Sequence, residues 1–406
     1  MTEPMLSVEE ALARVLSAFQ PLAAERVPIL DALERVLAED VAAAGDIPPH
    51  ANSSMDGYAV QSADTTGAST TAPIRLHVVG EVAAGHLPDA DVTPGTAVRI
   101  MTGAPLPEGA DAVVKVEDTS SQETWVDIHA AAPAGQYIRP AGEDVRRGER
   151  VLARGTLLRP QEIGMLATLG HTHVQVHRRP RVAILATGDE VLPIDAPLVP
   201  GKIRNANSYS NAAQVSKLGG VPILLGIAHD RVEELTAKIE AGLAQDVDLL
   251  LTSGGVSVGD FDLVKDVLAA EGEIAFWRVR MKPGKPLAFG HIGGVPVLGL
   301  PGNPVSVMVS FEMFVRPALL KMQGRTDLVR PIVEATLVEA VTRKDERRHY
   351  LRVHVEHQEG TYRAHLTGGQ GSGILSSMVK ANGLAIIPED WTHAEAGSQV
   401  SVILLD

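Results

Sequence analysis

The strongest constraint on the fold lies between Arg181 and Met322, where short strand-like runs alternate with segments of helical periodicity. Apolar residues are nearly continuous in the strand-like runs and recur every three to four positions in the segments between them. This order predicts a central, doubly wound parallel α/β domain. The expected elements are RVAILAT, NSYSNAAQVSKLGG, VPILLGI, DRVEELTAKIEAGLA, VDLLLTS, DLVKDVLAAEG and VPVLGLPGNPVSVMVSFEMFVRPALLKM.

The last helix of this domain has a defined expected start and one apolar face. Asn303 suits the N-cap, and Pro304 suits the first helical position because an N–H there would have no helical partner. The apolar residues that share a face are Val307, Phe311, Phe314, Val315 and Ala318. We expect this face to pack against the sheet.

The chain has 406 residues, more than one hydrophobic core usually serves. Ser7 with Glu10, and Asp31 with Glu34, match capping boxes and predict two short helices. Helical periodicity returns at RPQEIGMLATLG, while short alternating runs fill the region from about Asp46 to Glu143 and the region after Arg330. We predict a multidomain chain with a helical stalk (1–46 and 147–178), a β-rich insertion (47–146), the α/β domain (179–328) and a small C-terminal β-domain (329–406).

Composition excludes several classes of protein. The sequence contains no cysteine, so neither disulfides nor cysteine-ligated metals are available and any sulfur chemistry must come from a substrate. A net charge of −14 disfavours nucleic acid as a partner. No apolar run approaches the roughly 18 residues that span a bilayer, and the acidic first residues do not resemble a signal peptide. We expect a cytoplasmic protein that binds no membrane.

Three expected strands of the α/β domain end in polar or glycine-rich loops. These loops are ATGDE at 186–190, TSGGVSVGDFD at 252–262 and GLPGNPVS at 299–306. Ligands of open parallel sheets bind outside the carboxyl ends of the strands, where backbone N–H groups attract anions. One such loop alone is more often a tight turn, but three at one edge favour a ligand site.

A basic stretch, FWRVRMKPGKP, follows the second of these loops. Arg278, Arg280 and Lys282 alternate, so a continuous strand would place all three on one face, and Lys285 extends the group. This pattern favours a phosphate or oxyanion site. The alternative is a solvated strand face, because basic stripes are common.

Acidic residues in the same loops suggest a cation. Asp189, Glu190, Asp260 and Asp262 supply the oxygen ligands that Mg²⁺ prefers near phosphates. Each acid alone is as readily a helix cap, Asp262 in particular, so the ligand set stays open. The segment HTHVQVH at 171–177 does not predict zinc, because its outer histidines would lie about 20 Å apart on a strand; a half-exposed strand is the better interpretation.

Seven motifs resemble the molybdopterin molybdenumtransferases, the family of bacterial MoeA and the E domain of gephyrin. They occur in the family's order and span essentially the whole chain: NSSMDGYAV, IMTGAPLPEGADAVV, IRPAGEDV, ATGDE, SGGVSVGDFD, MKPGKP and LPGNPVS. The resemblance implies the same four-part organisation. It also implies a homodimer with its active site in a cleft between the α/β domain of one subunit and the β-rich parts of the other.

The resemblance implies roles for residues on both sides of that cleft. Catalytic residues carried over by motif are Asp56, Thr102, Asp144, Glu190, Asp230 and Asp262, with Glu190 and Asp262 also as metal ligands. Substrate-binding residues are Arg139, Gly254, Gly255, Ser257, Arg278, Lys282, Lys285, Pro301, Asn303, Ser306, Arg347 and Ser372. Arg278 stands where some relatives have lysine, and Arg347 matches its motif only loosely, whereas Ser372 matches better.

The reaction implied is insertion of molybdate into adenylylated molybdopterin, with release of AMP and formation of the molybdenum cofactor. Mg²⁺ would offset charge on the pyrophosphate. Transient contacts with the molybdopterin adenylyltransferase and with apo-molybdoenzymes would follow. Two alternatives stay open: another enzyme on the same α/β domain, such as the adenylyltransferase or a nucleotide hydrolase, and a scaffold, since gephyrin also clusters receptors. The match over the whole length argues against both.

Overall fold

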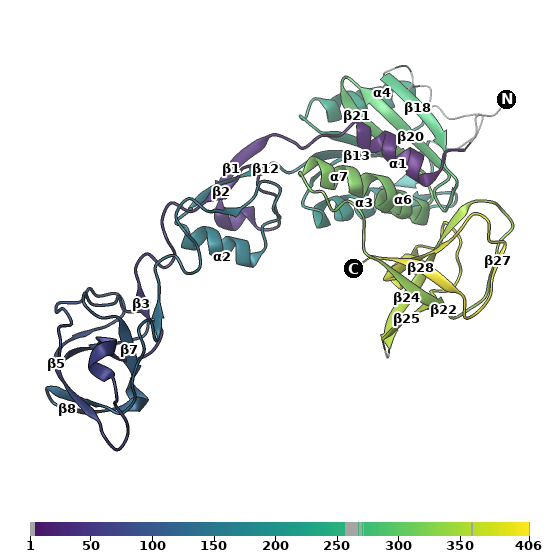
Figure 1. Cartoon of the computed structure of the whole chain (residues 1–406). Coiled ribbons are helices and arrows are strands. Elements are labelled where there is room, and N and C mark those ends of the chain that lie inside the picture. Colours follow the sequence, from purple (N-terminus) through teal and green to yellow (C-terminus); the bar gives the residue numbers. More distant parts are fainter. Residues whose placement is uncertain (1–4, 256–266, 268–269, 271, 359, 406) are drawn as a thin grey trace. The chain divides into compact units, whose positions relative to one another are not determined.

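The computed structural model describes residues 5–255, 267, 270, 272–358 and 360–405. The chain divides into two compact units. The smaller unit comprises residues 39–154 and 164–172, and the larger comprises residues 1–38, 155–163 and 173–406. This division is coarser than the predicted four domains, whose boundaries stay a prediction. Figure 1 labels the elements along the chain.

The smaller unit is built around one six-stranded sheet of order β7-β4-β6-β5-β9-β8. Its strands are β4 (Gly57–Val60), β5 (Ile74–Val82), β6 (Thr96–Ile100), β7 (Ala112–Lys115), β8 (Thr119–Gln122) and β9 (Trp125–Ile128). Two short pairs accompany the sheet: β3 (Asn52–Ser53) with β10 (Ile138–Arg139), and β2 (Val41–Ala42) with β11 (Arg150–Leu152). The expected β-rich region is therefore confirmed.

The larger unit contains the expected α/β sheet, in the order β16-β13-β17-β21-β20-β18. Four strands are parallel: β13 (Arg181–Thr187), β16 (Val221–Ala228), β17 (Leu249–Ser253) and β21 (Val295–Leu300). The remaining two, β20 (Pro286–Ile292) and β18 (Gly272–Arg278), add an antiparallel edge. The doubly wound α/β domain is confirmed, with this edge as an addition that periodicity did not predict.

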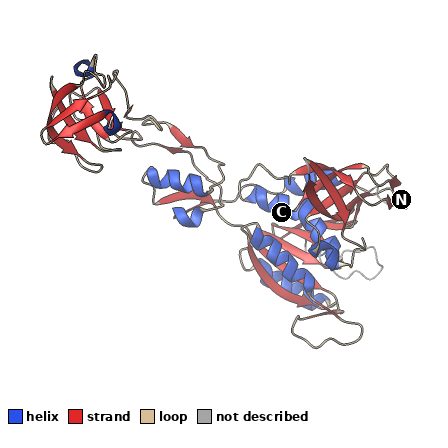
Figure 2. Cartoon of the chain, turned by 90° about the horizontal axis from the view of Figure 1, so that it is seen from below, coloured by secondary structure: helices blue, strands red, loops and turns tan. Residues whose placement is uncertain are grey.

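Helices cover both faces of this sheet (Figure 2), because alternate residues of its buried strands point to opposite sides. On one face, Val182 and Ile184 pack in a core with helices α1 (Val8–Ser17), α3 (Ala206–Lys217), α6 (Pro304–Ser310) and α7 (Arg316–Met322). On the other face, Ala183 and Leu185 pack against α4 (Val232–Leu243). The loops at the carboxyl edge are therefore anchored to a sheet that is packed on both faces.

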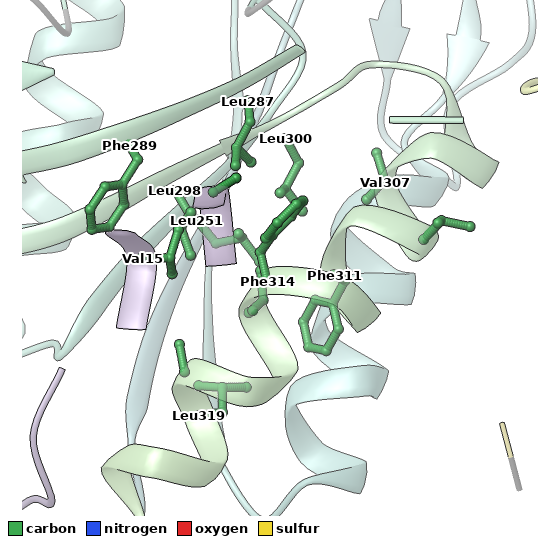
Figure 3. Close-up of a cluster of buried hydrophobic side chains, with 14 of the residues drawn as sticks. Val15, Leu251, Leu287, Phe289, Leu298, Leu300, Val307, Phe311, Phe314 and Leu319 are labelled. Carbon is green, nitrogen blue, oxygen red and sulfur yellow. The ribbon is translucent and has the colours of Figure 1, made fainter. Parts of the chain in front are cut away.

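The predicted apolar helix face is confirmed. Phe311 and Phe314 lie fully buried beside Leu298, Leu300 and the other side chains of this core (Figure 3). Between α6 and α7 the helix widens into a π-helical turn, η4 (Phe311–Val315), which keeps both phenylalanines against the sheet. Burying an aromatic side chain of this size stabilises the fold by roughly 2 to 3 kcal/mol.

A second sheet forms the C-terminal part of the larger unit. Its strands are β19 (Met281–Lys282), β22 (Ile332–Leu337), β24 (Arg348–Gln358), β25 (Thr361–Leu366), β26 (Gly383–Ile387) and β28 (Gln399–Leu404). A separate two-stranded sheet, β23 (Val341–Thr342) with β27 (His393–Ala394), and helix α8 (Leu375–Val379) belong to the same part of the chain. Because β19 belongs to this sheet, residues just after β18 connect the two sheets of the unit.

Of the two helices predicted near the N-terminus, one is confirmed and one is wrong. Ser7 and Glu10 form the expected capping box at the start of α1. No α-helix follows Asp31: a 3-10 turn, η1 (Ile29–Ala32), ends at once, and Glu34 takes a left-handed φ of 61°. The Glu34 N–H instead donates to Leu158 O at 2.7 Å, so a partner distant in sequence takes the donor that the Asp31 side chain would accept in a capping box.

Beside this turn, β1 (Ala24–Pro28) pairs with β12 (His173–His177), so most of HTHVQVH is a strand, as predicted. The His177 ring is buried and lies 2.7 Å from Leu22 O. The helix predicted at RPQEIGMLATLG is α2 (Pro160–Thr168). The short pair β14 (Val191–Leu192) and β15 (Ile203–Arg204) follows β13. No helix in the described part of the chain is long and apolar enough to cross a membrane.

Candidate functional site

A pocket of about 820 Å³ opens at the carboxyl edge of the parallel strands. The loops after β13, β17 and β21 form one side of it, and residues 282–286 and loops of the C-terminal sheet complete the lining. Eleven of the predicted site residues line this pocket: Glu190, Asp230, Gly254, Gly255, Lys282, Lys285, Pro301, Asn303, Ser306, Arg347 and Ser372. Three loops that are separate in sequence therefore meet at one site, as the strand order predicts.

Two glycines in these loops are needed for steric reasons. Gly254 has a φ of 97°, and a Cβ there would lie 2.7 Å from Thr187 O. Gly188 has a φ of 129°, and a Cβ there would lie 2.5 Å from a carboxylate oxygen of Glu190. A side chain at either position would be strained and would displace the neighbouring loop or the Glu190 carboxylate.

Three cationic side chains line the pocket, namely Lys282, Lys285 and Arg347. Burial lowers the pKa of Lys285, and the positive charges of Arg278 and Arg347 lower it further. Arg278 is not among the lining residues, yet its charge acts on Lys285, and its Nε is buried without a hydrogen-bond partner within the described part of the chain. The pocket is thus a site where an anionic ligand would gain several charge-assisted contacts.

The basic stretch does not form the single strand face that alternation predicted. β18 ends at Arg278, and β19 begins at Met281 in the other sheet. Val279 between them is held by the Lys285 carbonyl and forms a bridge with Leu6. These pairings interrupt the strand, so the prediction of one continuous basic strand face was wrong, and neither Arg278 nor Arg280 lines the pocket.

Two carboxylates, those of Glu190 and Asp230, line the same pocket and are exposed. The neighbouring Asp189 accepts a hydrogen bond from the Asp230 N–H at 3.1 Å, so its carboxylate fixes the loop rather than lining the pocket. Asp260, Asp262 and Ser257 lie outside the described residues. Within the described residues no group of three acidic or histidine side chains could hold a metal.

Four predicted residues belong to the smaller unit. Asp56 Oδ1 accepts hydrogen bonds from both the N–H and the hydroxyl of Thr102, each at 2.7 Å, and these bonds lower the pKa of Asp56. Gly57 follows, and a Cβ there would lie 1.9 Å from Val114 O, so the sheet requires glycine at this position. Arg139, in β10, and Asp144 are exposed. The sequence therefore brings Asp56 and Thr102 together from separate motifs.

Some lining residues were not predicted. Gln370 and Gly371 come from the loop GGQGSG, beside the predicted Ser372. Gln370 Oε1 accepts a hydrogen bond from the Arg352 N–H at 2.9 Å. The loop also meets the start of α6, because the Val305 N–H donates to Ser372 O at 3.0 Å. Only its place two residues before Ser372 in the same loop could have indicated Gln370.

Three family models together match nearly the whole chain. One described as MoeA N-terminal region (domain I and II) matches residues 6–170. One described as probable molybdopterin binding domain matches residues 183–321, and one described as MoeA C-terminal region (domain IV) matches residues 334–405. A protein of Mycobacterium tuberculosis named molybdopterin molybdenumtransferase 2 is 39% identical, with 98% of this chain and 99% of that protein covered. The chain belongs to the MoeA family.

Other relatives of this family agree. The molybdopterin molybdenumtransferase of Bacillus subtilis is 36% identical over 98% of this chain and 94% of that protein. A crystal structure of the molybdopterin biosynthesis MoeA protein of Pyrococcus horikoshii superposes with a TM-score of 0.87 at 35% identity, covering 99% of this chain and 100% of that one. The predicted resemblance to the MoeA family and the predicted fold class are both confirmed.

Proposed function

We propose that this MoeA-family chain is a molybdopterin molybdenumtransferase, which inserts molybdate into adenylylated molybdopterin, releases AMP and forms the molybdenum cofactor. The observation that carries the proposal is one pocket in which Lys282, Lys285 and Arg347 gather with the carboxylates of Glu190 and Asp230. Such a set suits two substrates, an oxyanion and a pterin that carries a phosphoanhydride. The names of the relatives give the chemistry its specific form.

The cations have the task of holding negative charge. Lys282 and Lys285 would bind molybdate or the phosphates as point charges, and Arg347 would bind two oxygens at once through its planar guanidinium. The Ser306 and Ser372 side chains are short hydroxyls at the same wall and would donate further hydrogen bonds. The dithiolene of the substrate supplies both sulfurs, in agreement with a chain that contains no cysteine.

We propose Glu190 as a ligand of Mg²⁺, together with Asp262. Magnesium commonly takes only one or two carboxylates and completes its shell with phosphate oxygens and water, so an exposed Glu190 on the pocket wall fits that requirement. When bound, the ion would offset charge on the pyrophosphate while water cleaves it. Asp230, on the same wall, is the next candidate.

We propose roles for Asp56, Thr102, Arg139 and Asp144 as well, and a homodimer in which they complete the substrate site. The hydrogen bonds from Thr102 keep the Asp56 carboxylate ionised. In this form it can accept a hydrogen bond and so orient a substrate hydroxyl or a water molecule. Contacts with the molybdopterin adenylyltransferase and with apo-molybdoenzymes would be transient, since substrate and product pass between these proteins.

The test is release of AMP from purified adenylylated molybdopterin, measured with and without molybdate. A molybdenumtransferase should release AMP faster when molybdate is present and should then activate an apo-molybdoenzyme. A nucleotide hydrolase would release AMP equally without molybdate, and an adenylyltransferase would instead form the adenylylated pterin from ATP. Failure to restore molybdoenzyme activity in a deficient strain would favour a scaffold.

A further inference from the structure

One carboxylate, that of Asp345, pairs with two of the three cations that line the pocket. Its Oδ2 accepts hydrogen bonds from Lys282 Nζ at 3.1 Å and from Arg347 Nη2 at 2.9 Å. Its Oδ1 accepts from Arg347 Nε at 3.2 Å and from the His349 ring at 2.9 Å. Asp345 itself is not a lining residue, so it acts on the pocket through the side chains it holds.

The backbone keeps this carboxylate in place. Pairing of β19 with β24 sets Lys282 opposite His349, so the two donors are neighbours in one sheet. Arg343, whose side chain is almost fully buried, donates from Nη1 to Asp345 O at 2.9 Å and also bonds to the Arg347 carbonyl. Partial burial raises the pKa of Asp345, but hydrogen bonds from Arg347, His349 and Lys282 bring it far below its usual range, so the group is an anion at neutral pH.

Lys285 differs from the other two lining cations, because its ammonium forms no ion pair within the described part of the chain. Among the three lining cations, Lys282 and Arg347 therefore share the negative charge of Asp345, which adds to the charges of Glu190 and Asp230 on the pocket wall. A ligand oxyanion that approaches Lys282 or Arg347 meets the field of Asp345 as well as that of the cations.

We propose that Asp345 is a positioning residue that holds Lys282 and Arg347 at the pocket wall. Because its negative charge competes with the ligand for these two cations, it lowers the affinity of the pocket for oxyanions. This inference rests on the proposed function, since it takes molybdate as the oxyanion. Its physical signature is a dependence on ligand charge. Removing a fixed negative charge changes the binding free energy in proportion to the charge of the ligand. The logarithm of the affinity should therefore rise twice as much for a dianion as for a monoanion.

Molybdate and perrhenate make this comparison, because both are tetrahedral oxyanions and they carry two charges and one. The full-length protein is titrated calorimetrically with each at low ionic strength, as wild type and as Asp345→Asn. We expect the variant to bind molybdate about tenfold more tightly and perrhenate about threefold more tightly. Glu346→Gln is the matched control: it removes the same charge one residue away, from an exposed side chain, and should change either affinity less than twofold.

Each outcome decides the proposal. Equal weakening of both ligands by Asp345→Asn would mean that the carboxylate only supports the loop, and unchanged affinities would mean that its charge does not reach the ligand. Asp345→Ser provides a second neutral side chain should the asparagine variant fail to fold, and unfolding of both would make Asp345 a structural residue and overturn the proposal. If neither wild type nor variant binds molybdate, the proposed function fails; normal binding without a gain contradicts this inference alone.

Discussion

A buried arginine under the Ser372 loop offers a test of whether that loop must be fixed for activity. Arg352 is 1% exposed, and no carboxylate pairs with it within the described residues. Its Nε donates to Ser377 Oγ at 3.1 Å and its Nη2 donates to Gly371 O at 3.2 Å. The guanidinium therefore ties both ends of the short segment that carries Ser372 into the pocket.

The stability effect of Arg352→Met can be estimated from these contacts. The two shorter hydrogen bonds that the charged guanidinium donates, to Ser377 and Gly371, contribute about 3 to 6 kcal/mol together, and a longer one from Nη1 to Tyr350 O at 3.4 Å adds little. Burial lowers the pKa of Arg352 to about 10, which corresponds to a cost of about 3 kcal/mol for keeping the charge. The acceptors keep other partners, because Ser377 Oγ donates to Ile374 O and Gly371 O accepts from the Ile374 N–H. We expect a net loss of only about 1 to 2 kcal/mol.

The same change should reduce molybdate-dependent AMP release by about tenfold or more, because a displacement of the loop near 1 Å is costly to catalysis. Urea unfolding and AMP release are measured on the same samples. Arg35→Met is the control: Arg35 is also buried and does not line the pocket, but it pairs with Glu25 as well as donating to His177 O at 2.8 Å. The reasoning is refuted if both variants lose activity only in proportion to their unfolded fraction.

Three further predictions follow from the proposed function. Sedimentation at micromolar concentration should give about twice 43.0 kDa, and full activity of a demonstrated monomer would contradict the homodimer. Lys282→Ala should weaken molybdate binding and make the affinity depend less on ionic strength. Titrations at two ionic strengths measure this, and an unchanged dependence would mean that the lysine is only solvated surface. The variants Glu190→Gln and Asp262→Asn should melt like the wild type but release AMP far more slowly, and their activity should recover partly as the Mg²⁺ concentration is raised. Turnover at the wild-type rate at low Mg²⁺ would exclude both residues as ligands.

The sequence predicted the α/β domain well because its signals are local. Apolar runs, a capping box at Ser7 and the Asn303–Pro304 helix start each depend on residues a few positions apart. The errors come from pairings over long sequence distances. Leu158 O accepts from the Glu34 N–H that the predicted capping box needed, and Leu6 pairs with Val279 where a continuous strand was expected. No local pattern contains that information.

The candidate site could be predicted only in part for the same reason. Loops that follow neighbouring parallel strands must meet at one edge, so Glu190, Gly254 and Ser306 could be grouped from the sequence. Asp345 could not, since it lies 63 residues from Lys282 and the two meet only because β19 joins the C-terminal sheet.

The acidic character of the whole chain gives the local cations a particular importance. With a net charge of −14, the protein does not attract anions at long range, and beyond about 10 Å at 0.1 M salt its charges are largely screened. Capture of an oxyanion must therefore depend on contacts inside the pocket. Added salt weakens those contacts but also screens the repulsion by the remaining surface. Removing the Lys282 charge takes away attraction and leaves the repulsion, which is why the salt dependence of binding, more than the affinity alone, should report whether this lysine contacts the ligand.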